Sequence, residues 1–145
     1  MKKRLFKYRI IGVLIFLIEL FIFALFSYGS YDSFIEVNSE DIFSQQNSVF
    51  SLALIISITA FLSLIFILFR IRKSILLLNI HYSIILLFFI YAFVESIFEN
   101  DLPHEDILKF VAIFSIIFVI LFIINFFKYK KVIFFEIDNI GTHND

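Results

Sequence analysis

The side chain with the clearest chemical potential is Glu19, the one charged residue in the stretch VLIFLIELFIFALF at 13–26. It lies about midway between Arg9 and Tyr28, so a helix rising about 1.5 Å per residue would place it near the middle of a lipid bilayer. An ionised carboxylate in hydrocarbon is costly, and the side chain should therefore turn inward, find a partner or stay protonated. We expect Glu19 to be largely neutral at neutral pH.

His81 and Ser57 are the candidate partners of this carboxyl group. His81 follows Lys73 by about two helical turns, which gives it nearly the depth of Glu19. At 100° per residue it shares one stripe of a helix with several polar or small residues, as Ser57 shares a face with two alanines. We expect Glu19 to meet His81, Ser57 or both. The stripe of His81 also holds Ser74, Phe88, Ala92 and Glu95, and the alanines beside Ser57 are Ala53 and Ala60. The candidate intramembrane polar cluster is Glu19, His81, Ser57 and Glu95.

Three interpretations of this cluster stay open. It could lock the register of the helices and their choice of partner, which is the most common use of buried polar groups in a membrane. It could instead line a proton- or cation-coupled path in which Glu19 titrates as substrate exchanges. The chain could also act through its lipid-exposed faces, by binding another membrane protein.

Other chemistry is sparse. The chain has no cysteine, which excludes disulfides and thiolate metal sites. PHED at 103–106 brings His104, Glu105 and Asp106 together, but neighbours at a helix start point in different directions, which favours a solvated turn over a metal site. No Gly-rich phosphate loop, HExxH or nucleophile elbow is present. We therefore expect no enzyme activity, no cofactor, no metal and no nucleic-acid partner.

The elements that position these residues are four long apolar runs. Of 145 residues, 61% are hydrophobic and 17% charged, against about 45–50% and 25% in a soluble domain. Each run is near the ~20 residues that cross a bilayer, is apolar all round and lacks proline, which predicts helices rather than barrel strands. The sequence thus predicts one all-α domain over 1–145, a membrane bundle with helices at about 10–28, 49–69, 74–94 and 107–127.

The basic residues predict the orientation of this bundle. All Lys and Arg except Lys109 lie before the first run, in the link 70–73 or in the tail 128–145, whereas the links 29–48 and 95–106 are acidic. The positive-inside rule then predicts an up-down-up-down path with both termini in the cytoplasm and the acidic links outside. The membrane would be a plasma membrane or a bacterial inner membrane. A cleaved signal peptide is the alternative for the first run, although that run is longer than a usual apolar core and contains Glu19.

The links carry fewer signals. RIRK at 70–73 predicts a tight hairpin, and the link 29–48 predicts either a short amphipathic segment at the outer interface or an irregular loop. In the second outer link, Asp101 is the expected N-cap, with Pro103, Glu105 and Asp106 in the first turn of the fourth helix. The end of the tail is expected to be disordered.

The function expected from these features is a non-catalytic structural or interaction role, as an accessory subunit or a partner-binding protein. In size, in four-span layout and in the basic hairpin FRIRKSI at 69–75, the chain resembles bacterial immunity proteins against pore-forming toxins. It is similar to small multidrug transporters only in layout and in a Glu in the first helix, because it has three glycines and no tryptophan. The partners expected are the lipid bilayer and a membrane protein or a second copy of the chain.

Overall fold

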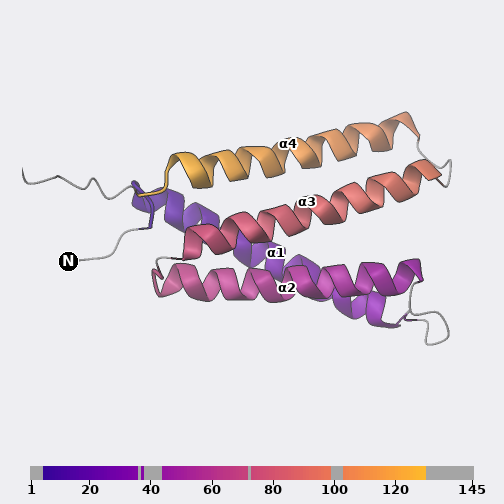
Figure 1. Ribbon diagram of the computed structural model, residues 1–145, viewed down its shortest axis with the longest axis horizontal. Coiled ribbons are helices and arrows are strands. Elements are labelled where there is room, and N and C mark those ends of the chain that lie inside the picture. The colour runs from indigo at the N-terminus through magenta and orange to yellow at the C-terminus, as the bar shows by residue number, and fades with distance from the viewer. Residues whose placement is uncertain (1–4, 36, 38–43, 72, 99–102, 130–145) are drawn as a thin grey trace, which may run out of the picture.

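The computed structural model describes residues 5–35, 37, 44–71, 73–98 and 103–129. Over these residues the chain forms four α-helices, which are α1 (Arg9–Ile35), α2 (Gln45–Leu68), α3 (Ser74–Phe98) and α4 (His104–Phe126) (Figure 1). All four are long and apolar enough to cross a membrane. The prediction of an all-helical fold with four helices long and apolar enough to cross a membrane is confirmed.

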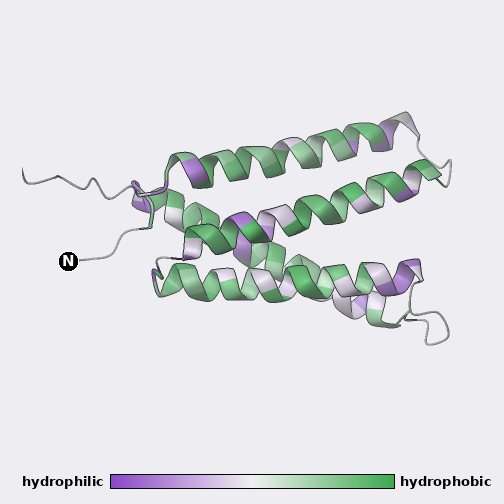
Figure 2. Ribbon diagram, in the orientation of Figure 1, coloured by the Kyte–Doolittle hydropathy of each residue, from purple (hydrophilic) through white to green (hydrophobic). Residues whose placement is uncertain are grey.

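Large apolar side chains are exposed along every helix. Hydrophobic residues occupy most of each helix (Figure 2). Soluble monomers rarely expose continuous apolar areas of this extent, whereas a membrane protein presents them to lipid. Each helix satisfies its own backbone hydrogen bonds, which hydrocarbon requires. The long apolar faces therefore fit contact with lipid.

Helices α2, α3 and α4 lie side by side in a row, and α1 crosses obliquely behind α2 and α3 (Figure 1). The most extensive helix pair is α1 with α2, where small buried residues of α2 allow close approach. Two of these are Ala53 and Ala60, on the face predicted for helix contact. The N-terminal end of α1, the α2–α3 turn and the C-terminal end of α4 lie at the same end of the molecule (Figure 1).

That end is tied together by backbone pairing between the segments that flank α1 and α4. Lys7 N–H donates to the carbonyl of Phe127 at 2.8 Å, and Tyr129 N–H donates to the carbonyl of Leu5 at 2.8 Å. Tyr8 and Phe127 add a ring contact with centroids 5.9 Å apart. These contacts hold the start of α1 beside the end of α4, although α4 otherwise packs against α3.

Several helix ends differ from the predicted ones. α1 continues past Tyr28 to Ile35, α2 begins at Gln45 and α3 continues to Phe98, because a helix can run on into water after its apolar run has ended. The link predicted over 29–48 is thus helical at both ends; residues 36 and 38–43 lie outside the described residues, as does Asp101. Pro103 is the N-cap of α4, not part of its first turn, while Glu105 and Asp106 do lie in that turn.

The α2–α3 turn is closed by a Schellman motif. Ile71 N–H donates to the carbonyl of Phe66 at 3.0 Å, and Arg70 N–H donates to that of Ile67 at 3.1 Å. Arg70 has φ 51°, the left-handed conformation that this position requires and that glycine usually supplies. Ser74 then donates its hydroxyl to the carbonyls of Phe66 and Ile71 at 2.8 and 2.6 Å. The predicted hairpin forms, but with an arginine in the glycine position.

Candidate functional site

The structure brings Glu19 of α1 and His81 of α3 together in the interior. Oε2 of Glu19 lies 3.4 Å from Nε2 of His81, and both side chains have 0% exposure. Hydrophilic residues interrupt the apolar helices where α1 crosses α3 (Figure 2). The inward stripe of α1 is Ile15, Glu19, Phe26 and Ser30, which follow the helical period. Glu19 therefore occupies a core position, not a lipid-facing one.

Thr59 of α2 completes a contact among three helices. Its Oγ1 lies 2.8 Å from Nδ1 of His81, and 2.9 and 3.0 Å from the carbonyl oxygens of Ile55 and Ile56 in its own helix. Those carbonyls can only accept, so the single hydroxyl proton of Thr59 is directed to them and Oγ1 accepts from Nδ1–H of His81. We infer this tautomer from the hydrogen-bond pattern.

This tautomer determines how the Glu19–His81 pair can be charged. With Nδ1 carrying a proton, Nε2 of a neutral imidazole has a lone pair facing the carboxyl group, which attracts it only if Glu19 is protonated. In the alternative form, the carboxyl proton of Glu19 moves to Nε2 of His81, and the two side chains become an ion pair. Both forms hold one shared proton and have no net charge, and the neutral form avoids placing two charges in hydrocarbon.

Several buried polar atoms, including those of this pair, have no hydrogen-bond partner in the described part of the chain. They are both carboxyl oxygens of Glu19, Nε2 of His81, the hydroxyl of Tyr82 and that of Ser63. The hydroxyl of Tyr82 is near enough to interact electrostatically with Glu19, although its geometry falls short of a hydrogen bond. Buried polar atoms that lack partners are costly, so an apolar core would be more stable here.

Ser57 lies apart from Glu19. Its hydroxyl is 2.7 Å from that of Ser27, two turns further along α1, and Ser57 is buried. Ser27 also receives the Ser30 hydroxyl at its carbonyl, at 3.0 Å. The pair fastens α1 to α2 beyond the Glu19 level. Of the two partners expected for Glu19, the structure brings it to His81 and not to Ser57.

Glu95 lies near the far end of α3, away from the Glu19–His81 pair. Its carboxylate accepts from Nε2 of Gln45 at 3.0 Å and from the Tyr91 hydroxyl at 2.7 Å. The contact with Gln45 links the start of α2 to the end of α3. Glu95 is half-buried and serves a second, separate polar contact between helices.

The structure shows no metal-binding group among the residues it describes: nowhere there do three His, Asp or Glu side chains gather. Of the PHED residues, Asp106 accepts from Nζ of Lys109 at 2.6 Å as an exposed pair one turn apart. Glu105 is exposed, and the side chain of His104 is outside the described residues. This arrangement fits a solvated first turn.

Sequence reasoning missed Thr59, Tyr82 and Ser27. Tyr82 is adjacent to His81, and its ring is 1% exposed, but its type is equally common at a membrane interface. Thr59 and Ser27 are residues that often bond only to their own helix. Thr59 could have been predicted from its expected depth in the membrane, because it lies within one helical turn of Ser57, which was selected for that depth. Comparison with protein-family models, curated proteins and solved structures finds no match to this chain.

Proposed function

We propose that the chain is a small multi-pass protein of a cell membrane with a non-catalytic structural or interaction role, as an accessory subunit or partner-binding protein. An immunity-like role, in which the protein binds a membrane-active toxin, is one form of this proposal. The observation that supports it most is the junction of Glu19, His81 and Thr59, which joins α1, α2 and α3 through two buried side chains and the half-buried Thr59. Such a junction specifies helix register and orientation.

The outer surface of α4 supports an interaction role. Among the side chains of this helix that the structure describes, only Ile117, Ile120 and Ile124 are buried, so most of its apolar surface is available to lipid or to a partner helix. The partner could be another membrane protein or a second copy of the chain. We further propose an up-down-up-down course with both termini cytoplasmic in a plasma or bacterial inner membrane, on the strength of the basic ends.

The alternative is a small proton- or cation-coupled transporter that uses Glu19. The close approach of the Glu19 carboxyl group to His81 and the lack of hydrogen-bond partners for these buried atoms among the described residues favour this candidate. Against it stands the enclosure of the pair, since both side chains have 0% exposure and coupling would require an alternative conformation that opens the site.

The experiment that separates the two is Glu19→Gln in cells and in mild detergent. A structural junction predicts lower abundance or lower thermal stability and no effect on proton-linked uptake. A coupled path predicts normal abundance with loss of a proton-linked phenotype. Ser115→Ala is the matched control, because Ser115 is exposed on α4 and its hydroxyl bonds only to the carbonyl of Val111 in its own helix.

Purification of the tagged full chain in mild detergent tests the interaction role directly. A membrane protein recovered in stoichiometric amount, or a defined homo-oligomer, is the expected result. A monomer that purifies alone, together with uptake activity in vesicles, would favour the transporter. A reporter fused after Asp145 tests the orientation, and a signal from outside the cell would contradict it.

A further inference from the structure

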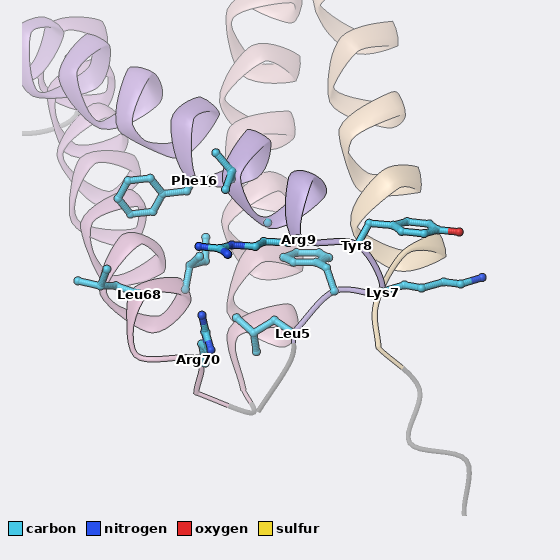
Figure 3. A pocket seen from close by; sticks show the side chains of 11 residues that line it. Leu5, Lys7, Tyr8, Arg9, Phe16, Leu68 and Arg70 are labelled. Carbon is cyan, nitrogen blue, oxygen red and sulfur yellow. The ribbon is translucent and has the colours of Figure 1, made fainter. Parts of the chain in front are cut away.

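A pocket of about 590 Å³ opens between the first turns of α1 and the last turn of α2. It lies at the end of the molecule where the basic segments gather, in the size range of about 300–1,000 Å³ typical of small-molecule sites. Figure 3 shows Arg9 and Arg70 extending into the same space, beside Leu68 and Phe16, while Lys7 points the other way. The pocket thus combines a cationic mouth with an apolar wall.

The two guanidinium groups have no acidic partner in the described residues. The acidic groups with a basic partner there are Glu19, beside His81, and Asp106, beside Lys109, and no acidic side chain lines the pocket among the residues described. Two like charges that face one space repel each other, and an anion between them removes the repulsion. The planar fork of arginine suits a phosphate group, because it can donate two parallel hydrogen bonds.

The backbone at Arg70 is shaped to present this charge. Residue 70 sits at the left-handed position of the Schellman motif, where glycine would be free of strain. An arginine there accepts an unfavourable backbone conformation and gains a guanidinium group directed toward Arg9 (Figure 3). Strain at a charged residue beside a pocket points to a binding role.

The wall of the pocket identifies the class of ligand. The apolar wall beside the cationic mouth is formed by Val13, Phe16, Ile67 and Leu68, of which Val13 and Leu68 are exposed, Phe16 is half-buried and Ile67 is buried. This wall lies at the level where a membrane-spanning helix leaves the hydrocarbon. A free phosphate would use the mouth only, whereas a phospholipid would place its phosphate there and an acyl chain on the wall. Basic pockets between membrane helices on the cytoplasmic side suit anionic head groups.

We propose that this pocket binds an anionic phospholipid, with its phosphate between Arg9 and Arg70 and an acyl chain against Phe16 and Leu68. The inference rests on the membrane placement proposed above and adds a specific lipid site to it. The lipid fills the seam between the first two helices and neutralises the cations that meet there.

Native mass spectrometry of the full chain in mild detergent tests the site. The probes are phosphatidylglycerol, phosphatidylcholine with the same acyl chains, and inorganic phosphate. We expect phosphatidylglycerol to be retained about 25-fold more strongly than phosphatidylcholine, since each of the two cations contributes about fivefold. Arg9→Gln/Arg70→Gln should abolish this preference, whereas Arg9→Lys/Arg70→Lys should keep a large part of it.

The matched control is Lys73→Gln/Lys128→Gln, which removes two cations at the same end but outside the pocket. Equal binding of the two lipids, an equal loss in this control, or occupancy by inorganic phosphate in competition with lipid would each overturn the proposal. If the double arginine variant does not yield folded protein, Arg70→Gly replaces it, because glycine suits the backbone conformation of residue 70. This variant should also weaken the preference for phosphatidylglycerol, and an unchanged preference would overturn the proposal. A chain that stays soluble without detergent would instead contradict the membrane placement itself.

Discussion

Glu19 and His81 meet across the crossing of α1 and α3, with Oε2 and Nε2 3.4 Å apart and neither side chain exposed. The imidazole is held from its other side by Thr59 of α2 at 2.8 Å. One side chain from each of three helices therefore fixes the same point in the interior. A shift of any one helix would separate these groups and leave their polar atoms alone in an apolar surrounding, which is why the contact can specify register.

Replacement of Glu19 by alanine should destabilise the protein much more than replacement by glutamine. Alanine leaves a cavity and an imidazole without its neighbour, at a cost of about 2–4 kcal/mol by analogy with other large-to-small core changes. Glutamine keeps the volume and can donate to Nε2 of His81, and we expect a smaller but measurable loss of about 1 kcal/mol. Unfolding in detergent, followed by circular dichroism, measures both. Equal losses for the two variants would show that the carboxyl charge, not the contact, matters.

The proton of His81 should reside on Nδ1. Because Thr59 directs its own hydroxyl proton to a main-chain carbonyl, Nδ1–H donates to it and Nε2 is left as the acceptor. Nitrogen-15 spectra of labelled protein in lipid distinguish the two tautomers and the doubly protonated ring. Thr59→Val should shift the His81 signals, whereas Ser83→Ala, an exposed change on α3, should not. A doubly protonated ring in the wild type would mean that Glu19 is ionised.

The α1–α2 contact should tolerate loss of a hydroxyl but not added volume. Ala60 has 0% exposure, and leucine at that position would force the two helices apart, at a cost of about 1–3 kcal/mol. Ser57→Ala removes only the bond to Ser27 and should cost about 0.6 kcal/mol, an average value for such bonds in membranes. Ile58→Leu, on the exposed face of the same helix, is the control. Stability measured by unfolding in detergent should rank the three variants in this order.

How far the sequence could predict this site depended on depth and periodicity. The four spans followed from run length, and the placement of Glu19 near His81 followed from their similar depth and inward stripes. The choice between His81 and Ser57 as partner of Glu19 required knowledge of the oblique course of α1. That course brings Ser27 of α1, not Glu19, next to Ser57 of α2. Helix ends were misplaced because an apolar run ends at the membrane boundary while the helix itself continues, as α1 does to Ile35. The left-handed conformation of Arg70 was not predicted, because the turn contains no glycine to indicate it.

Helix α4 should depend on one amide pair for its attachment to α3. Nδ2 of Asn125 donates to Oδ1 of Asn79 at 2.6 Å, and the reverse contact is 3.4 Å. Each Nδ2 also donates to a carbonyl of its own helix, of Ile75 for Asn79 and of Leu121 for Asn125, so loss of either amide breaks the contact between the helices without leaving the other Nδ2 unpaired. Asn79→Ala and Asn125→Ala should therefore have similar effects, and the double variant little more than either one. The chain has no cysteine, so a cysteine pair introduced at Phe93 and Phe110, whose rings are 5.1 Å apart, reports on the contact. Its cross-linking rate should fall in both single variants, and additive losses would contradict a shared contact.

Arg70→Gly should raise stability while it weakens lipid binding. A left-handed conformation costs a non-glycine residue about 1–2 kcal/mol, and glycine removes most of that strain but adds some freedom to the unfolded chain, for a net gain of about 1 kcal/mol. The hydrogen bonds of the motif are made by backbone groups and should survive the change. Unfolding in detergent without added lipid isolates this gain. With phosphatidylglycerol present the wild type should recover part of the difference, since a ligand of the folded state stabilises it. Lys73→Gly, at an exposed position of the same turn with no positive φ, should give no such gain. If Arg70→Gly lowers stability in both conditions, the side chain holds the turn together and the strain argument fails.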